Sequence, residues 1–498
     1  MLYRNYVDGR WVESSSGETF KVTNPANGEV LGEVVESTPE DVDAAVKVAE
    51  RTFDWWRKYP AARRGEILFR AGEILVRRKD ELARLMSMEM GKVLNESRGD
   101  VQEGIDMTYY MAGEGRRAFG LTTPSELPDK LAMAVREPVG VVAAITPWNF
   151  PLAIPTWKLM PALVLGNTVV FKPSAETPIL GTMLVHVLEE AGLPPGVLNL
   201  VNGPGSTVGE ALIKHPGVAL ISFTGSNETG RHVAAEAAQT GKRISLELGG
   251  KNAIIVLDDA NLALAVDGIV WSAFGTTGQR CTAASRIIVQ RGVKDRLVKR
   301  LVERTSQLRL GDPLEPTTDV GPVINRTQLE KIDRAVQTAK QEGARVLVGG
   351  HIAREGEVAK GSFYEPTILD DVAPGMRVAQ EEIFGPVTAI IAVDNLEEAI
   401  RINNQVAYGL STSIYTQDVN KAFVAVRDIR TGLVYVNAGT IGAEVHLPFG
   451  GMRQTSNGHR EAGIAALDVY SEWKTIFVDY SGRLQRAQID VAEGGAAA

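Results

Sequence analysis

Short apolar runs and longer helical segments alternate through the middle of the chain, and this pattern organises the sequence. Five runs rich in β-branched residues are predicted to be strands, at residues 139–145, 167–172, 196–201, 218–223 and 243–248. Segments with helical spacing lie between them, at about 152–165, 177–192, 206–214 and 228–240. Such alternation is typical of a parallel sheet with helices on both faces, so we expect a doubly wound α/β fold.

Different patterns flank this region. Residues 1–36 are predicted to form short strands and turns, and helical spacing then begins at Thr38 and continues, with breaks, to about residue 110. A second α/β region follows Gly250. Its strands are predicted at 285–290 and 387–393, and its helices at about 261–275, 292–308 and 325–342. A chain of 498 residues is too long for one core, so we expect two or three domains.

Polar and glycine residues follow the carboxyl ends of the predicted strands, where ligands bind on sheets of this kind. Asn149 follows the first strand, Lys172 ends the second, and Glu247 lies near the end of the fifth. Taken singly, these residues also fit structural roles as a turn residue, a solvated charge and an ion-pair partner. Gly225-Ser226 opens a helix after the fourth strand and suits a phosphate, because free N–H groups and the helix dipole attract anions. That signal is weak alone, and the dinucleotide motif GxGxxG is absent.

Cys281 is the only cysteine in the chain, and it lies in the stretch FGTTGQRCTAASR at residues 274–286. Arg280 precedes it, and glycine or hydroxylated residues lie on either side. Nearby positive charge and backbone N–H groups favour the thiolate, which is the nucleophilic form. A lone thiol is more often a small buried hydrophobe, so these residues alone leave both interpretations open.

The amino-acid composition limits which binding partners and which cellular compartment fit the chain. The net charge of −8 and the pI near 5.5 argue against nucleic acid as a main partner, because phosphate binding requires a basic surface. A single cysteine cannot form an internal disulfide, which fits a reducing compartment. The N-terminus has no apolar signal region, and no apolar run reaches membrane-spanning length, so a cytoplasmic protein is expected.

Seven motifs, in order along the chain, carry a resemblance to a known family. They are PWNFP (147–151), KPS (172–174), FTGS (223–226), LELGGKN (246–252), GQRC (278–281), EEIFGPV (381–387) and PFGG (448–451). With these motifs the chain, from residue 5 to about residue 480, resembles the aldehyde dehydrogenase superfamily. Any one motif would be a weak signal, whereas all seven in the family's order are a strong one. The resemblance implies NAD(P)-dependent oxidation of an aldehyde to a carboxylic acid.

The resemblance also implies how the chain is divided. It implies a doubly wound dinucleotide-binding domain at 1–123 and 143–250, and an α/β catalytic domain at 251–440. A small β oligomerisation flap is expected at 124–142 and 466–490, together with a homodimer or homotetramer. The low-complexity tail at 491–498 is expected to be disordered.

The family's catalytic roles carry over onto matching residues. Cys281 would attack the aldehyde carbon to give a thiohemiacetal, whose oxyanion the Asn149 amide and the Cys281 backbone N–H would stabilise. After hydride transfer has left a thioester, Glu247 would activate the water that hydrolyses it. Relatives that transfer the acyl group to CoA or phosphate lack this carboxylate, so Glu247 favours hydrolysis to a free acid.

A cofactor site is implied in the same way. Lys172 would hold the adenosine ribose or its phosphate, Ser226 the pyrophosphate and Glu382 the nicotinamide ribose, with Phe384 against the nicotinamide. The positions assigned to the cofactor are Ile145, Thr146, Pro147, Trp148, Lys172, Ser174, Ala175, Gly205, Gly209, Phe223, Gly225, Ser226, Leu248, Gly249, Glu382 and Phe384. Many NAD-preferring members carry glutamate where this chain has Ala175, so NADP is the expected cofactor, with NAD also used. No metal is expected.

Two subfamilies resemble the chain most. AEVHLPFGG (443–451) resembles α-ketoglutaric semialdehyde dehydrogenases, whereas YSGRLQRAQ (480–488) is similar to α-aminoadipic semialdehyde dehydrogenases. In the second group an arginine and a glutamate that match Arg280 and Glu103 hold the aminocarboxylate. A carboxylated semialdehyde is therefore expected, since arginine binds carboxylates bidentately. The alternatives are a broad-specificity aliphatic or aromatic aldehyde dehydrogenase and a non-catalytic binding or structural member.

Overall fold

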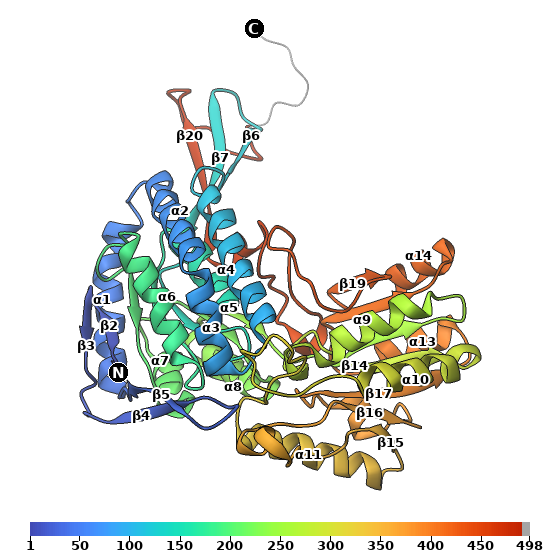
Figure 1. The fold of residues 1–498 in the computed structure, drawn as a ribbon. Helices are drawn as coiled ribbons and strands as arrows, with labels where there is room; N and C mark the ends of the chain where they lie inside the picture. Colours follow the sequence, from blue (N-terminus) through green and yellow to red (C-terminus); the bar gives the residue numbers. More distant parts are fainter. Residues whose placement is uncertain (491–498) are drawn as a thin grey trace.

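The computed structural model describes residues 1–490, so the predicted disorder of residues 491–498 lies outside the described residues. Figure 1 shows two α/β lobes side by side and a smaller sheet that projects from one of them. Each lobe is built on a seven-stranded sheet. The first sheet takes its strands from residues 5–247 and the second from residues 252–436. Strands and helices alternate in both lobes, so the predicted α/β fold class is confirmed.

The first sheet has the strand order β12-β11-β8-β9-β10-β2-β3. Its strands are β2 (Asn5–Val7), β3 (Arg10–Val12), β8 (Val141–Ile145), β9 (Thr168–Lys172), β10 (Leu198–Leu200), β11 (Leu220–Thr224) and β12 (Arg243–Glu247). The strands from β12 to β10 are parallel, and they are the five apolar runs predicted from the sequence. β8, β9 and β10 are buried along their whole length because helices cover both faces of the sheet.

Helices of the first lobe pack on both faces of this sheet. They are α1 (Pro39–Trp56), α2 (Ala61–Arg77), α3 (Lys79–Met90), α4 (Leu94–Glu114), α5 (Ala153–Leu165), α6 (Pro178–Glu190), α7 (Glu210–Lys214) and α8 (Asn227–Thr240). α1, α7 and α8 share one core, and α2 to α6 share the other. α1 begins as predicted, because Thr38 and Asp41 form a capping box. The predicted helix at 206–214 instead starts with a π-helical turn at Gly205–Gly209, where the two glycines weaken the preference for a regular α-helix.

The second sheet has the order β15-β16-β17-β14-β13-β18-β19, and only β15 runs antiparallel to its neighbour. Its strands are β13 (Asn252–Val256), β14 (Ala284–Gln290), β15 (Arg345–Val348), β16 (Thr367–Asp370), β17 (Val387–Val393), β18 (Ser411–Tyr415) and β19 (Leu433–Val436). Its helices are α9 (Leu262–Phe274), α10 (Arg291–Thr305), α11 (Arg326–Gln341), α12 (Arg377–Gln380), α13 (Leu396–Asn404) and α14 (Val419–Asp428). The sequence did not predict the strand β13, because it continues the apolar pattern of β12 after a break at Gly249-Gly250.

The projecting sheet at the top of Figure 1 consists of β6 (Leu121–Pro124), β7 (Lys130–Pro138) and β20 (Ser471–Asp479). β20 pairs antiparallel with β7 along all nine of its residues. Just before β20, after α15 (Ala466–Val469), the Tyr470 carbonyl accepts a hydrogen bond from the Asn167 side chain at 2.9 Å. The C-terminal segment therefore returns to the first lobe. The flap boundaries at 124–142 and 466–490 stay predictions.

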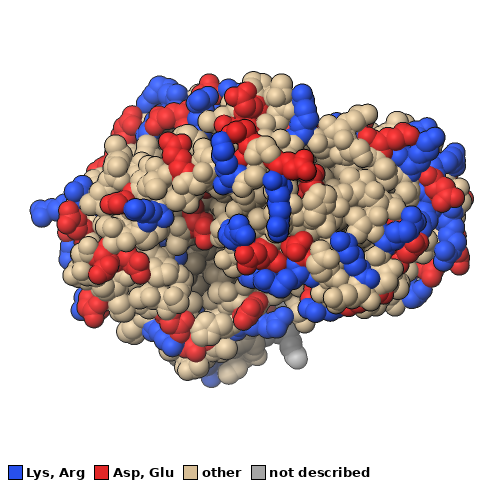
Figure 2. Space-filling model, turned by 60° about the horizontal axis from the view of Figure 1, so that its bottom comes forward, with Lys and Arg blue, Asp and Glu red and all other residues tan. Residues whose placement is uncertain are grey.

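A second small sheet lies near the N-terminus, with the order β1-β5-β4. It consists of β1 (Leu2–Tyr3), β4 (Thr19–Thr23) and β5 (Val30–Val35). Basic and acidic side chains are interspersed on the face of the molecule that Figure 2 shows, which differs from the one-sided basic surface typical of nucleic-acid-binding proteins. Within residues 1–490, none of the helices combines the length and the apolar character that crossing a membrane requires.

Candidate active site

A cavity of about 660 Å³ lies between the two lobes. One wall comes from the segments that follow β8, β11 and β12, and the other comes from Cys281, α11 and the segment around α12. Ten lining residues were assigned to the site from the sequence: Pro147, Trp148, Asn149, Gly225, Ser226, Leu248, Gly249, Cys281, Glu382 and Phe384. The volume is ordinary for a ligand site, for which about 300–1,000 Å³ is usual. The structure therefore brings motifs from distant parts of the chain to one cavity.

Cys281 follows an unusual turn. α9 ends at Phe274, and in the tight turn that follows it Thr276 and Thr277 have φ angles of +53° and +57°. Such left-handed conformations are rare for β-branched residues. The turn leads the chain out of α9 and places Cys281 on the cavity wall, just before β14.

Burial and the charges around the Cys281 thiol disfavour the thiolate. Burial, followed by the nearby carboxylates of Glu382, Glu247 and Glu103, raises the pKa of the thiol to about 12, and Arg280 offsets this only in part. The expected influence of Arg280 is therefore right in direction but outweighed. Because the thiol is protonated at neutral pH in this environment, the nucleophile has to lose its proton during the reaction.

Asn149 and Asn252 contact the cysteine segment from two sides. The buried Nδ2 of Asn149 donates to the backbone carbonyl of Gln279 at 3.1 Å. Asn252 Nδ2 donates to the Cys281 carbonyl at 2.7 Å. Gly250 is required beside it, since a Cβ there would lie 2.5 Å from the Cys281 carbonyl oxygen. The Cys281 carbonyl is thus turned toward β13, while Asn149 lines the cavity.

Glu247 ends β12 and is buried, and its Oε2 has no hydrogen-bond partner among the described residues. Burial raises the pKa of Glu247 well above its usual value, the Glu461 carboxylate raises it further, and Lys158 lowers it. Lys158 and Glu461 form a buried ion pair, and Lys158 Nζ also donates to Ser222 Oγ at 3.2 Å. Glu247 itself does not line the cavity, although its neighbour Leu248 does.

Residues predicted to bind the adenosine half lie on strand ends and loops of the first lobe rather than on the cavity wall. Lys172 ends β9, and its Nζ donates to the Pro173 carbonyl at 3.0 Å. A Cβ at Gly209 would lie 3.9 Å from the Lys172 side chain, so the π-helical turn is beside this lysine. Burial lowers the pKa of Lys172 to about 8. The other predicted cofactor residues outside the cavity lining are Ile145, Thr146, Ser174, Ala175, Gly205 and Phe223.

The segment that contains Glu382 and Phe384 is held against the first lobe. Glu382 Oε1 accepts from the Gly250 N–H at 2.9 Å, and burial raises the pKa of Glu382 to about 7. Gly249 lies so close to the Glu382 carboxylate that any Cβ would clash. Phe384 has a φ of +57° and meets Trp148 edge to face, with ring centroids 5.4 Å apart. A strained backbone of this kind persists only where the surrounding contacts hold it in place.

Helix α11 supplies cavity residues that the sequence did not single out. Gln328 Nε2 donates to the backbone carbonyls of Ile383 at 2.9 Å and Phe384 at 3.0 Å. Lys331 and Arg334 also line the cavity, and neither forms an ion pair with any other residue that the structure describes. Their spacing places them on one helix face. Nothing in the sequence indicates that this polar face meets a cavity rather than solvent.

The two residues predicted to bind substrate lie near the cysteine, and each affects the pKa of its thiol. Arg280 Nε donates to Thr276 Oγ1 at 2.9 Å. Its guanidinium lies over the rings of Phe150 and Trp271, at 5.3 and 5.0 Å from their centroids. Burial raises the pKa of Glu103 to about 8. No ion pair joins Glu103 to Arg280, neither lines the cavity, and their role in substrate binding stays a prediction.

Comparisons with known families, sequences and structures all point to one family. Residues 11–476 match the aldehyde dehydrogenase family. The chain is 45% identical to alpha-ketoglutaric semialdehyde dehydrogenase from Bacillus subtilis, covering 96% of this chain and 98% of the relative. It is also 45% identical to alpha-ketoglutarate semialdehyde dehydrogenase from Haloferax volcanii, covering 96% and 99%. The crystal structure of betaine aldehyde dehydrogenase from Staphylococcus aureus in complex with NAD+ matches with a TM-score of 0.94 at 37% identity, covering 97% of this chain and 95% of that chain. The chain therefore belongs to the aldehyde dehydrogenase family, and the protein is an aldehyde dehydrogenase that uses a nicotinamide cofactor.

Proposed function

We propose that this aldehyde dehydrogenase oxidises a carboxylated semialdehyde to the corresponding acid through a thioester on Cys281, which Glu247 helps to hydrolyse. The observation that carries the proposal is the meeting of Cys281, Asn149 and Glu382, from two lobes, at one cavity. The substrate class is supported by 45% identity, over nearly the whole chain, to alpha-ketoglutaric semialdehyde dehydrogenases.

Formation of the acyl intermediate would begin when Cys281 gives its proton to solvent and its sulfur attacks the aldehyde carbon. Negative charge then develops on the former carbonyl oxygen. Asn149 Nδ2, which lies beside the cysteine turn, would stabilise that charge together with the Cys281 backbone N–H. The bond from Asn149 to Gln279 uses one of the two amide N–H groups, so the second is free to donate.

Residues around the cavity fit a nicotinamide dinucleotide. Ser226 is the N-cap of α8, where free N–H groups favour a phosphate. Glu382 would bind the nicotinamide ribose, and Phe384 would pack against the ring. Lys331 and Arg334, on the opposite wall, have no ion-pair partner among residues 1–490 and are available to the anionic part of the cofactor. When bound, the nicotinamide brings positive charge near the thiol and accepts the hydride that leaves the thiohemiacetal.

Hydrolysis would use Glu247 as the base. Its raised pKa makes it a stronger base than an exposed carboxylate, so it takes a proton from water more readily. Its buried Oε2 has no partner among residues 1–490, which is expected of an acceptor that receives a hydrogen bond only when water enters.

Local chemistry around Lys172 supports NADP as the preferred cofactor, with NAD also used. Ala175 places no carboxylate near the adenosine ribose, and Lys172 and Ser174 offer a cation and a hydroxyl to a 2′-phosphate. Glu176 is partly buried, and burial raises its pKa. A hydrogen bond from the Asn325 side chain offsets this only in part, and it gives Glu176 a partner outside this site. A kcat/KM about tenfold or more better with NAD, roughly 1.4 kcal/mol of discrimination, would contradict the preference.

Substrate choice is tested by a panel of aldehydes with both cofactors. We expect α-ketoglutaric and α-aminoadipic semialdehydes to have a higher kcat/KM than hexanal and benzaldehyde. The physical reason is the Arg280 guanidinium, whose fork can bind a carboxylate. One observation favours a broad-specificity enzyme instead: Arg280 already bonds Thr276 and lies over two aromatic rings. Equal kcat/KM for hexanal and the semialdehydes would support that second candidate.

The projecting sheet supports a homodimer or homotetramer. β20 is an edge strand, and its Trp473 and Phe477 side chains are 46% and 62% exposed. Large apolar side chains on an unpaired edge are typical of an association surface. Light scattering at micromolar concentration tests the assembly, and a monomer would contradict it. The single cysteine supports a cytoplasmic location, because a reduced thiol is needed at Cys281.

A further inference from the structure

One carboxylate outside the cavity holds the turn that precedes the cysteine. Both oxygens of Glu96, in the first turn of α4, accept from the Thr276 N–H, at 3.0 and 2.8 Å. Glu96 Oε2 also accepts from Thr276 Oγ1 at 3.1 Å. The Glu96 side chain is only 5% exposed, and the two residues are 180 positions apart in the sequence. These contacts link α4 of the first lobe directly to the cysteine segment.

Thr276 and Thr277 need such support, because both adopt a left-handed backbone conformation that strains a β-branched residue. The Thr277 hydroxyl is held separately, by the Gly321 carbonyl at 2.9 Å. The Thr276 N–H has the Glu96 carboxylate as its acceptor. Without Glu96, the Thr276 N–H would lose its partner and the turn would lose one of its restraints.

The same contacts reach the residue next to the nucleophile. Thr276 Oγ1 donates to Glu96 and accepts from Arg280 Nε at 2.9 Å, while an Arg280 terminal nitrogen lies 3.7 Å from Glu96 Oε1. Arg280 is covalently joined to Cys281. A continuous path of contacts therefore runs from Glu96 through Thr276 and Arg280 to the backbone N–H of Cys281.

We propose that Glu96 is a positioning residue for the nucleophile: it holds the left-handed Thr276–Thr277 turn and thereby sets the Cys281 side chain and backbone N–H. The inference rests on the proposed role of Cys281 as the nucleophile. Glu96 does not line the cavity, so it acts through Thr276 and touches neither substrate nor cofactor. A displacement of about 1 Å at a reacting group can cost about 100-fold in rate. The loss should therefore fall on the first chemical step and not on cofactor binding.

Two variants separate the hydrogen bonds of Glu96 from its charge. Glu96→Ala removes every acceptor, and it is expected to slow the first turnover by about 10- to 100-fold in stopped-flow measurements of cofactor reduction. The KM of the cofactor should change less than about threefold. Glu96→Gln keeps an oxygen that can accept from the Thr276 N–H, so it should restore most of the first-turnover rate.

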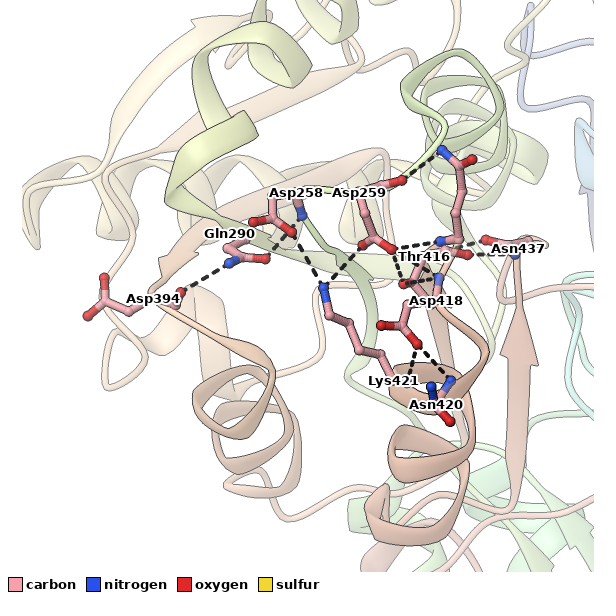
Figure 3. Close-up of polar contacts among 10 residues, drawn as sticks. Asp258, Asp259, Gln290, Asp394, Thr416, Asp418, Asn420, Lys421 and Asn437 are labelled. Carbon is pink, nitrogen blue, oxygen red and sulfur yellow. Dashed lines mark hydrogen bonds and ion pairs between the residues drawn. The ribbon is translucent and has the colours of Figure 1, made fainter.

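Asp259 offers a matched control, and Figure 3 shows its contacts. Its Oδ2 accepts from Thr416 Oγ1 at 2.7 Å and from the backbone N–H groups of Gln417 and Asp418 at 3.0 Å each. It follows the carboxyl end of β13, whereas Cys281 contacts the amino end, and the five residues of that strand span about 16 Å. Asp259→Ala should lower thermal stability and leave the first-turnover rate within about twofold.

The outcomes are distinct. Equal slowing by Glu96→Ala and Asp259→Ala, per folded enzyme, would overturn the inference, as would a Glu96→Gln variant as slow as Glu96→Ala. If Glu96→Ala does not fold, Glu96→Asp replaces it. The shorter aspartate side chain cannot span the distance to the Thr276 N–H. An equal first-turnover rate for Glu96→Asp and Glu96→Gln would also overturn the inference. Cys281→Ala tests the underlying function by itself, since turnover in that variant would refute the proposed nucleophile whatever Glu96 does.

Discussion

The Trp148 and Phe384 rings meet edge to face, with centroids 5.4 Å apart, at a point where the two lobes close around the cavity. Trp148 follows a strand of the first sheet. Phe384 belongs to the second lobe, in a segment whose carbonyls accept from Gln328. A ligand in the cavity therefore lies between surfaces that are already in contact, and changes on either wall can be tested separately.

Asn149→Ala is expected to lower kcat by about 10²–10³-fold, which is the cost of losing one oxyanion donor in measured cases. The cofactor Kd should be nearly unchanged, because the amide contacts the cysteine segment. Steady-state kinetics and a fluorescence titration with the cofactor measure the two quantities. Unchanged turnover would refute the role of Asn149.

Glu247→Gln should separate the two halves of the reaction. The first turnover should persist, because it needs Cys281 and Asn149, while steady-state turnover should fall by about 10²–10⁴-fold as hydrolysis loses its base. Intact-mass spectrometry of quenched samples should then show the acyl group on the protein. A first turnover that slows as much as the steady state would instead place Glu247 in the first step.

Glu461→Gln should move the acid limb of the pH profile. Glu461 raises the pKa of Glu247 more than Lys158 lowers it, so removing the Glu461 charge lowers the pKa of the base. Glu247 would then be ionised at lower pH, and the kcat of hydrolysis would persist at lower pH. Rates between about pH 5 and 9 check the shift. A shift to higher pH would contradict the electrostatic account.

The control for that experiment is thermal stability. Glu461→Gln leaves Lys158 buried without its charged partner, which typically costs about 3–5 kcal/mol. The profile should therefore be recorded well below the melting transition of the variant. Loss of the folded state at the assay temperature would be visible by circular dichroism and would not move the pH limb of the remaining enzyme.

Ala175→Glu should shift cofactor preference toward NAD. A carboxylate near the adenosine ribose can accept from the hydroxyls and repels a 2′-phosphate. We expect kcat/KM with NADP to fall about tenfold or more, with a smaller change for NAD. An Ala175→Gln variant adds similar volume without charge and serves as the control. Equal losses for both cofactors would show that the position acts by size.

Arg334→Ala should weaken cofactor binding by about fivefold, the effect of roughly 1 kcal/mol, because an unpaired cation on the cavity wall would lose its attraction to the phosphates. The difference in cofactor Kd between the variant and the unchanged enzyme should shrink as the salt concentration increases. Arg326→Ala is the matched control on the same helix, since Arg326 is 76% exposed and pairs with Glu330. Equal Kd values for both variants would contradict the role of Arg334.

The sequence predicted the first sheet closely because its parallel strands are buried apolar runs separated by helices. It did not predict the strand β13, whose apolar residues follow β12 after only a short glycine break. Asn149, Cys281 and Glu382 were identified through motifs that lie beside strand ends and turns. Arg334 was not, because a polar helix face has the same pattern whether it meets solvent or a cavity.

Long-range contacts explain the other omissions. Glu96 holds a turn 180 residues away, and no local pattern indicates such a partner. The positive φ angles of Thr276 and Thr277 are equally hidden, since threonine ordinarily disfavours that conformation. The sequence-based prediction also gave too much weight to Arg280, because the sequence does not show that the thiol is buried and lies near three carboxylates.

The pairing of β7 with β20 has a consequence for biosynthesis. The second sheet is continuous in sequence and can close once residue 436 has emerged from the ribosome. The contacts of the first lobe are complete only after the Tyr470 carbonyl has accepted its hydrogen bond from Asn167 and β20 has paired with β7. At about 5–20 residues per second, the roughly 220 residues that separate Glu247 from Tyr470 take about 10–45 s to synthesise. The lobe that is made first is therefore completed last.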